Sequence, residues 1–467
     1  MFQLTPAGVL TDLYSFCSQT NCTDGDRPYG GLARGAVGNF YGSTYEGGGS
    51  ADCPAGCGTI FQITPGGTLT TLYRFSATDG AYPYGNLLLA SDGNFYGATA
   101  EVSDFGPVGN GTIFKITSGG TLTTLHTFSG TDGSYPYGPL VRAPNGTFYG
   151  TTNEGGSGTN CADNCGTVFA ITPAGVLTTL HNFAGTDGCY PYGGMTLVGT
   201  VLYGTASQCG TNNVGTVFKI TTTGALSTLH NFSGPDGSLI QATNGKLYGT
   251  TEEGGSDPSC FQPTNCSGTV FQITPAGALT TLHAFNGTDG STLFGGVAEA
   301  TNGIFYGTTN RSAFSLGIGL APFVETVPAS GPEGATVNIL GTNLAGVTGV
   351  SFGAAAATFT IVSPTLITAT VPDGATTTKI GVTTPGQSSA ISGCAWVGGT
   401  ATCILASTSG FEIGYPLATR RGYSSEVQHR QDHDHRDLRR PDQLCPNCEP
   451  RRVQVGRNSL GAQYDAV

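Results

Sequence analysis

The feature that most constrains this chain is a segment of about fifty residues that recurs along its first two thirds. The string Gly-Thr-Ile/Val-Phe-x-Ile-Thr starts at five glycines: Gly58, Gly111, Gly166, Gly215 and Gly268. A truncated copy opens the chain at Phe2, and a degenerate copy contains Phe314. A unit of this length cannot bury its apolar face alone, so neighbouring copies must stack on one another.

Each copy contains four short apolar runs bounded by Gly, Pro, Asn or Asp, which is typical of β-strands. The Phe strand is represented by 215–221, the Thr strand by 122–128, and a short strand lies near Leu87. The Tyr strand is centred on a repeated tyrosine: Tyr41, Tyr96, Tyr149, Tyr203, Tyr248 and Tyr306. Four antiparallel strands repeated in this way predict an all-β fold, a β-propeller of six blades, or of seven if the chain starts further upstream.

The connections between these strands alternate in length. Tight turns such as Pro65-Gly66-Gly67 and Asn145-Gly146 join the Phe strand to the Thr strand and the short strand to the Tyr strand. The other two connections are long, and in an antiparallel meander they emerge at the same end of the sheet. We call this end the long-loop face and predict that it carries the binding surface.

Ring closure can be predicted from the strands at the two ends of the repeat region. Residues 2–16 supply a Phe strand and a Thr strand, and the last short and Tyr strands lie near Val297 and Tyr306. We expect these four strands to pair, because closing the ring removes exposed sheet edges.

Composition excludes several classes of protein. Charged residues are 10% of the chain, the net charge is −12, and residues 1–410 contain nine of the 18 Lys and Arg. A chain so poor in basic residues is unsuited to nucleic acid. With no run of 18 apolar residues, no transmembrane segment is expected. We also expect a monomer. Met1 stands where Ile or Val precedes the other Phe residues, so we expect an upstream leader.

The 14 cysteines favour an oxidising compartment and disulfide bonds. Zinc is the competing interpretation, but the CxxxC pairs have no further Cys or His nearby in the sequence. Cys189 and Cys209 have no local partner, yet strand parity puts both on the long-loop face of neighbouring strands, which predicts a bond between them. The candidate pairs are Cys17 with Cys22, Cys53 with Cys57, Cys161 with Cys165, Cys189 with Cys209, Cys260 with Cys266, and Cys394 with Cys403.

The candidate binding residues are tyrosines of the repeated Tyr-Pro-Tyr-Gly motif, in which proline preorganises the loop and the rings offer flat platforms. Packing beneath the loop is the alternative role. The candidates are Tyr82, Tyr84, Tyr135, Tyr137, Tyr190 and Tyr192. They belong to three of the first four copies, so a patch built from them is lopsided.

Two other repeated residues are expected to be structural. A histidine recurs in the Thr strand, where it is interchangeable with Tyr14 and Tyr73, and we expect it to pack between blades. An aspartate recurs in Asp-Gly and is expected to close a turn, with a calcium site as the alternative. The residues are His126, His181, His230 and His283, and Asp24, Asp79, Asp132, Asp187, Asp236 and Asp289. No catalytic motif, cofactor site or metal site is predicted.

After residue 318 the repeat ends and two further regions follow. Residues 319–410 alternate strand-like runs with Gly/Pro turns, which predicts a small immunoglobulin-like β-sandwich that folds independently. Residues 411–467 contain nine Arg and the sequence His429-x-x-x-His433-x-His435. This tail has no apolar periodicity and is expected to be disordered, or out of frame.

The motifs resemble two known families. The strings GTVFxIT, TLTTLHxF and NGxFYGTT are similar to the bacterial GloVer tandem repeats of "choice-of-anchor" surface proteins, over residues 1–317. Residues 322–390 resemble an IPT/TIG domain through Pro328 with Gly331, 337–341 followed by Asn343, 350–353 and 367–372. The first resemblance implies an exported bacterial protein and no assigned activity.

Together these features predict a secreted or cell-surface protein with a binding or structural role. Its ligands on the long-loop face are expected to be glycans or surface proteins. The alternative is an extracellular carbohydrate-active propeller enzyme, namely a hydrolase, lyase or oxidase. An oxidase needs copper held by several His and a Tyr. Every His before the tail is a repeat residue, which argues against one.

Overall fold

The fold is known from a computed structural model that describes residues 1–403 apart from short gaps. The gaps are 6–8, 36–37, 102–109, 159–160, 162–163, 212–214, 232–236, 253, 255–266, 294, 311, 321–323, 328–332, 342–343, 374, 376–379, 385–386, 391–393 and 398–399. The predicted tail and Asp236 lie outside the described residues. Cys260 and Cys266, which were predicted to form a disulfide, also lie outside them, in the gap at 255–266.

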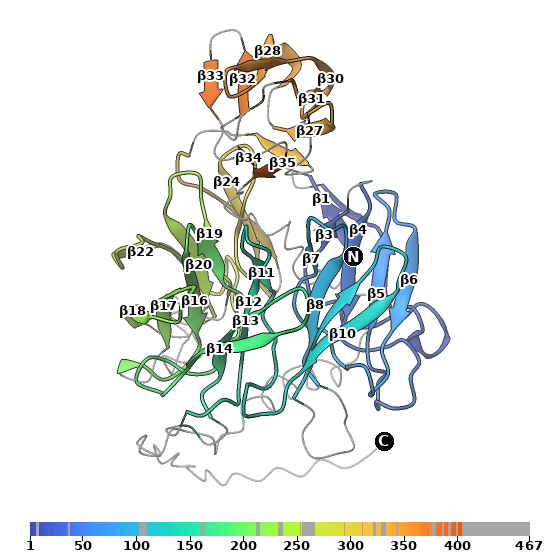
Figure 1. The fold of residues 1–467 in the computed structure, drawn as a ribbon, viewed down its shortest axis with the longest axis vertical. Helices are drawn as coiled ribbons and strands as arrows, with labels where there is room; N and C mark the ends of the chain where they lie inside the picture. The colour runs from blue at the N-terminus through green and yellow to red at the C-terminus, as the bar shows by residue number, and fades with distance from the viewer. Residues whose placement is uncertain are drawn as a thin grey trace, which may run out of the picture.

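The repeat region forms an all-β propeller, as predicted (Figure 1). Five sheets have the order short, Tyr, Phe and Thr strand, and a sixth has the first three. The short strands are β3 (Ala33–Arg34), β7 (Leu88–Leu89), β11 (Val141–Arg142), β15 (Thr196–Val198), β19 (Ile240–Gln241) and β23 (Ala298–Glu299). The Tyr strands are β4 (Phe40–Thr44), β8 (Phe95–Thr99), β12 (Phe148–Thr152), β16 (Val201–Ala206), β20 (Leu247–Thr251) and β24 (Ile304–Thr308).

The outer half of each sheet consists of the Phe strand and, in the five four-stranded sheets, the Thr strand. The Phe strands are β5 (Thr59–Ile63), β9 (Thr112–Ile116), β13 (Thr167–Ile171), β17 (Thr216–Thr221), β21 (Thr269–Ile273) and β25 (Ala313–Gly317). The Thr strands are β6 (Leu69–Arg74), β10 (Leu122–Thr127), β14 (Leu177–Asn182), β18 (Leu226–Asn231) and β22 (Leu279–Ala284). Short strands of successive sheets, such as β11 and β15, contact each other and therefore lie innermost.

Aromatic side chains join each sheet to the next. Tyr96 of β8 lies against Phe148 of β12, with ring centroids 4.2 Å apart, and Phe128 lies against Phe169 at 5.4 Å. The Phe residues of the Phe strands and the Tyr residues of the Tyr strands supply much of the buried core. The tyrosine and phenylalanine periodicity of the sequence is therefore the periodicity of the interfaces between blades.

The predicted ring closure is wrong. Strands β1 (Phe2–Leu4) and β2 (Leu10–Asp12) pair only with each other among the described strands, and β24 pairs with β25. The degenerate copy keeps Phe314 opposite Gly307, so β25 fills the place that the N-terminal Phe strand was expected to take. Phe16 packs against Phe61 at 5.0 Å, as Phe75 packs against Phe114 at 5.4 Å. Strands β1 and β2 thus occupy the position of a preceding blade's outer half.

The second region is an immunoglobulin-like sandwich of two four-stranded sheets. One contains β26 (Glu325–Val327), β27 (Thr336–Leu340), β31 (Leu366–Thr370) and β30 (Phe359–Ser363). The other contains β29 (Ala355–Ala357), β28 (Gly349–Phe352), β32 (Ile380–Thr384) and β33 (Gln387–Ala390). A hairpin follows, β34 (Cys394–Val397) and β35 (Thr400–Cys403), which places the backbones of Cys394 and Cys403 opposite each other. The domain limits given above remain a prediction.

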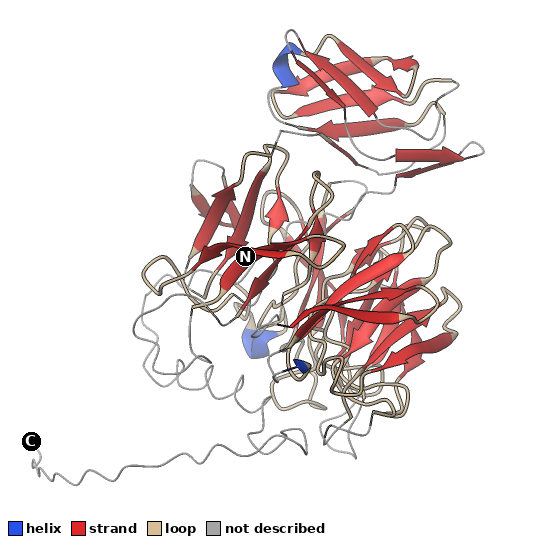
Figure 2. Ribbon diagram, turned by 90° about the vertical axis from the view of Figure 1, so that its left-hand side faces the viewer, coloured by secondary structure: helices blue, strands red, loops and turns tan. Residues whose placement is uncertain are grey.

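The sandwich and the long-loop face lie at opposite ends of the propeller. The 3-10 helix η1 (Thr20–Cys22) belongs to a long connection, and Figure 2 shows it among the loops at the end away from the sandwich. The sandwich therefore leaves the long-loop face uncovered. In the part of the chain described, no helix has both the length and the apolar character needed to span a membrane.

Candidate functional site

The two long connections of a blade lie side by side, as strand parity predicts. Single backbone bridges join them at equivalent positions in four successive copies: Asp26 with Glu46, Ala81 with Glu101, Ser134 with Glu154, and Cys189 with Gln208. In the second copy the Ala81 N–H donates to the Glu101 carbonyl oxygen at 2.7 Å. The long-loop face is therefore a surface tied together by backbone hydrogen bonds.

The predicted Cys189–Cys209 disulfide is present on this face, with Cα atoms 5.4 Å apart. Three of the local pairs are also bonded: Cys17–Cys22, Cys53–Cys57 and Cys161–Cys165. The bond between Cys189 and Cys209 adds a covalent link at a position where the other copies have only the backbone bridge.

The other two predicted disulfides stay predictions. Cys260 and Cys266 both lie outside the described residues. The backbones of Cys394 and Cys403 are paired in the last hairpin, but their side chains lie outside the described part of the chain.

The first tyrosine of each Tyr-Pro-Tyr motif has a left-handed backbone conformation, with φ of 60° at Tyr82 and 55° at Tyr135 and Tyr190. Such values are uncommon for a residue other than glycine. Hydrogen bonds on both sides hold the conformation: the Tyr82 N–H donates to the Cys57 carbonyl oxygen at 2.9 Å, and its carbonyl accepts from Ala100 at 3.0 Å. The backbone conformation of the motif is therefore fixed by the hydrogen bonds around it, and so is the direction in which the chain continues.

The second tyrosine of each motif converges with its counterparts from other blades. Tyr84 lies 5.4 Å from Tyr137 and 5.3 Å from Tyr192, ring centroid to ring centroid, and Tyr137 lies 5.0 Å from Tyr192. Tyr29, which ends the related sequence Arg-Pro-Tyr, lies 5.1 Å from Tyr84. We call these four residues the tyrosine cluster. They come from four successive copies of the repeat.

Other aromatic rings surround the tyrosine cluster. Tyr45 stacks on Tyr82 at 4.8 Å and also contacts Tyr29 and Tyr84, while Tyr135 stacks on Tyr137 at 5.9 Å. Of the six predicted residues, five are thus joined through ring contacts. Tyr190 instead packs against the core of the third and fourth blades. Tyr137 and Tyr82 are buried, and the other four predicted tyrosines are half-buried.

Carboxylates lie beside these rings. Burial, followed by the negative charges of Glu101 and Glu46, raises the pKa of Tyr45 far above its usual range. Burial is also the main reason that the pKa of Tyr137 is raised, and Glu101 and Glu154 contribute. Glu46 forms an ion pair of 3.0 Å with Arg27. Tyr45 and Tyr137 therefore stay protonated at neutral pH.

Sequence reasoning missed the residues that complete this site. Tyr29 belongs to a divergent copy of the motif, in which Arg27 replaces the first tyrosine and adopts the same left-handed conformation, with φ of 52°. The glutamates recur after the Tyr strand at Glu46, Glu101 and Glu154. That recurrence was a readable signal, because a turn residue repeated at one position of each blade must lie on one face.

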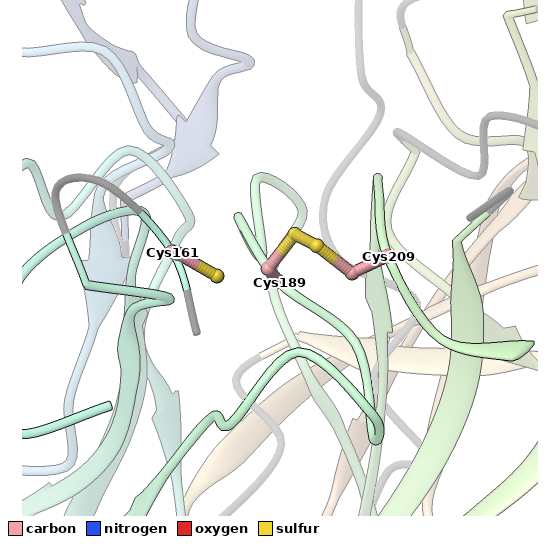
Figure 3. A group of neighbouring side chains, drawn as sticks. All are labelled: Cys161, Cys189 and Cys209. Atoms are coloured by element: carbon pink, nitrogen blue, oxygen red, sulfur yellow. A yellow bond between two sulfur atoms is a disulfide. The ribbon is translucent and has the colours of Figure 1, made fainter. Parts of the chain in front are cut away.

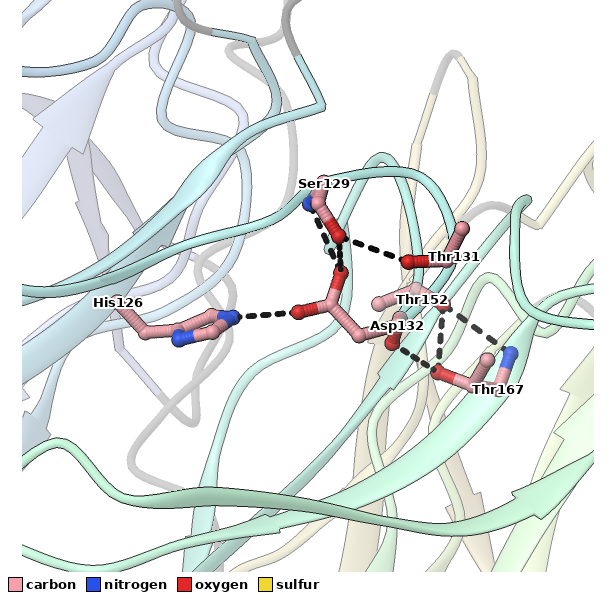
Figure 4. Close-up of polar contacts among 6 residues, drawn as sticks. All are labelled: His126, Ser129, Thr131, Asp132, Thr152 and Thr167. Atoms are coloured by element: carbon pink, nitrogen blue, oxygen red, sulfur yellow. Dashed lines mark hydrogen bonds and ion pairs between the residues drawn. The ribbon is translucent and has the colours of Figure 1, made fainter.

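The repeated histidines and aspartates, treated separately in the sequence, are partners. In Figure 4 the His126 Nε2 lies 2.8 Å from an Asp132 carboxylate oxygen, and the other oxygen accepts from the Ser129 N–H at 2.8 Å. The same His–Asp contact recurs at His181–Asp187 (2.7 Å) and His283–Asp289 (2.8 Å). Tyr14 and Tyr73 donate to Asp24 and Asp79 at the equivalent positions, at 2.8 and 2.5 Å.

This pairing explains why Tyr and His are interchangeable in the Thr strand, since both reach the same carboxylate. Each ring also packs edge-to-face on the phenylalanine two residues later, as His126 does on Phe128 at 5.1 Å. In each described pair, the aspartate follows the Thr strand that contains its His or Tyr partner, so both residues belong to the same copy of the repeat. We infer a structural contact that fastens the long connection to the outer strand.

A second polar contact repeats within the blades. Thr152 and Thr167 share a buried hydroxyl–hydroxyl hydrogen bond of 2.8 Å, and Thr167 also donates to the Asp132 carbonyl oxygen at 3.3 Å (Figure 4). The contact recurs at Thr44–Thr59, Thr99–Thr112 and Thr251–Thr269. These hydroxyls satisfy each other inside the blade and are therefore structural.

Solved structures align with this chain at low sequence identity and low TM-score. A gluconolactonase from Xanthomonas campestris aligns at 15% identity with a TM-score of 0.38, covering 61% of this chain and 84% of that protein. PorZ, a surface component of the type-IX secretion system of Porphyromonas gingivalis, aligns at 15% identity with a TM-score of 0.39, covering 78% and 50%. No curated protein matches the chain.

Family models match both parts of the chain. The model of the Gloeobacter/Verrucomicrobia repeat matches residues 1–200 and 102–319, and the model of the IPT/TIG domain matches residues 323–394. The matches confirm the two resemblances drawn from the motifs. The chain therefore belongs to the Gloeobacter/Verrucomicrobia repeat family and has an IPT/TIG domain after its repeats.

Proposed function

We propose that this protein is an exported binding protein, secreted or displayed at the cell surface, that holds its ligand on the long-loop face of the propeller. The observation that carries this proposal is the tyrosine cluster. Four copies of the repeat direct a ring to one place, and glutamates from the neighbouring connections lie beside it.

The chemistry of the cluster favours glycans or surface proteins as ligands. Tyrosine combines a flat apolar ring with a hydroxyl, and it loses little conformational entropy on binding. Glutamate carboxylates accept hydrogen bonds from sugar hydroxyls or protein amides. The four described disulfides support an oxidising compartment and thus export.

The repeated His–Asp pairs do not favour the enzyme alternative. A catalytic pair needs a reacting group within hydrogen-bond reach and usually stands alone in its protein. Here the pair recurs on the outer strand of successive blades, and Tyr replaces His in two of them. We therefore propose a binding role.

The proposal is tested by glycan-array and surface-protein binding with exported protein, followed by affinity measurements on Tyr84→Ala. Because Tyr84 contacts four other rings, we expect at least about a tenfold loss of affinity. Tyr306→Ala, which removes a half-buried ring from β24 of the sixth sheet, is the matched control and should keep wild-type affinity. Glu101→Gln tests the site without removing a ring. Equal binding by wild type, Tyr84→Ala and Glu101→Gln would place the ligand elsewhere.

A further inference from the structure

Two disulfides lie next to each other where the third and fourth described four-stranded sheets meet. Cys161 and Cys165 belong to the connection between β12 and β13, Cys189 follows β14, and Cys209 follows β16. The sulfur atoms of Cys161, Cys189 and Cys209 all lie within 4.8 Å of one another. Figure 3 shows Cys161 directed toward the Cys189–Cys209 bond.

The backbone holds these cysteines in place independently of their disulfides. The Tyr190 N–H donates to the Cys165 carbonyl oxygen at 3.0 Å, which ties the connection that contains Cys165 to the one that contains Cys189. The Cys189 N–H donates to Gln208 at 3.0 Å, and the Gly215 N–H donates to the Cys209 carbonyl oxygen at 2.9 Å. These hydrogen bonds do not depend on the disulfides, so reduction leaves the connections that contain the four cysteines tied together.

The cluster is also shielded from water. Cys165 and Cys189 are fully buried, and Cys209 and Cys161 are 4% and 7% exposed. Four converging thiols in such an environment are the donor set of a structural zinc site, which is closed and tetrahedral. With Zn–S bonds of about 2.3 Å, neighbouring sulfurs in a tetrahedral site are about 3.8 Å apart. The sulfurs of Cys161, Cys189 and Cys209 already lie within 4.8 Å of one another, and Cys165 is held beside them through its bond to Cys161.

We propose that the reduced protein binds one zinc ion through Cys161, Cys165, Cys189 and Cys209. A dithiol reductant opens each disulfide by exchange, giving two protein thiols and one oxidised reductant molecule per bond. The four thiols then lose four protons and bind Zn²⁺ through four thiolates. Exchange with two molecules of a small-molecule disulfide reverses the process: they are reduced to thiols, the two protein disulfides form again, and the ion is released. The site thus cross-links the same connections in both redox states.

The sequence argued against zinc because no CxxxC pair has a further cysteine nearby in the chain. The fold supplies the missing pair for one of them, by bringing Cys189 and Cys209 beside Cys161. The Cys53–Cys57 pair has the same spacing and belongs to no metal-ligand group among the described residues. Cys17 and Cys22 lie near Asp26, but that group offers only three ligands and is not buried. The Cys53–Cys57 and Cys17–Cys22 pairs therefore serve as internal controls for zinc binding.

The experiment uses the full chain, reduced anaerobically and supplied with Zn²⁺, then passed over a chelating resin. We expect one retained zinc per chain by elemental analysis. Compared with the reduced, metal-free protein, zinc should slow alkylation of the four ligands and leave the alkylation rates of Cys53 and Cys57 unchanged, as mapped by mass spectrometry. Co²⁺ in place of zinc should give the absorption of a tetrahedral thiolate site.

Matched double variants separate the site from general effects of losing a disulfide. Cys189→Ser with Cys209→Ser should lose zinc retention, and Cys53→Ser with Cys57→Ser should keep it. Near-ultraviolet circular dichroism reports whether each reduced protein is folded. The proposal is overturned if the reduced chain retains no zinc, if both double variants retain it equally, or if zinc protects Cys53 and Cys57 as well. These outcomes are independent of ligand binding at the tyrosine cluster.

Discussion

The glycine after the tyrosine of each Tyr strand is required by the phenylalanine that faces it. In the third copy, a Cβ atom at Gly150 would lie 2.5 Å from the Phe169 ring and 3.0 Å from Leu140. The same conflict recurs at Gly42, Gly97, Gly204, Gly249 and Gly307. The Tyr-Gly pair is therefore a packing rule of the repeat.

Gly150→Ala tests this rule. Replacing glycine by alanine stabilises a chain by about 0.4–1 kcal/mol where the residue fits, but overpacking a core costs about 1–3 kcal/mol. We expect a net destabilisation in urea unfolding. Gly317→Ala on β25 is the control, because no atom lies within 4 Å of its added Cβ. A Gly150→Ala protein as stable as Gly317→Ala would contradict the rule.

The His–Asp contact gives a pH-dependent prediction. Burial raises the pKa of Asp132, but hydrogen bonds from Ser129 and His126 outweigh it and leave the pKa below 3.8. A carboxyl with a lowered pKa in the folded state stabilises the protein above its unfolded pKa, and this contribution disappears as the pH falls through the folded pKa.

Asp132→Asn should therefore destabilise the protein near pH 6, by about 1 kcal/mol. The difference from wild type should shrink as the pH falls below 3.8 and through the lower pKa of the folded carboxyl, which then becomes neutral. Thermal melts from pH 6 to pH 3 provide the measurement, with Asp12→Asn at an exposed position of β2 as the control. A difference that stays constant over this range would show that the charge has no role.

At the scale of elements, the Cys189–Cys209 bond closes the longest of the four described disulfide loops on the long-loop face. The bond closes a loop with a sequence separation of 20, while Cys53–Cys57 has a separation of 4. In the chain-entropy model these loops contribute about 3 and about 2 kcal/mol, respectively. We expect the Cys189→Ser, Cys209→Ser protein to be the less stable of the two double variants under oxidising conditions. Denaturant melts that rank them in the opposite order would refute this.

Strand identity and parity could be predicted from the sequence because they depend on local patterns. The Tyr and Phe strands, the tight turns and the shared face of Cys189 and Cys209 all follow from period and alternation. Ring closure could not be predicted in this way, since it depends on whether the degenerate strand at Phe314 still pairs. The tyrosine cluster was only partly predictable, because its member Tyr29 and the neighbouring ring of Tyr45 lie outside the strict Tyr-Pro-Tyr motif.

At the scale of the whole molecule, the propeller and the sandwich have separate cores. The buried core cluster of the sandwich consists of twelve residues between Val324 and Val382, and it contains no residue of the blades. The propeller instead distributes its core over clusters that each span neighbouring blades. Unfolding one region should therefore expose little apolar surface of the other.

A fragment of residues 319–410 should accordingly fold by itself, since its size is within the range of autonomous small domains. We expect a β-type circular dichroism spectrum and a cooperative thermal transition. Calorimetry of the full chain should show a transition at the same temperature, separate from that of the propeller, because each core melts as its own unit. A fragment that melts gradually and binds a hydrophobic dye would show instead that the sandwich depends on the blades. A single transition of the full chain, with a shifted midpoint, would locate that dependence at the junction between the two regions.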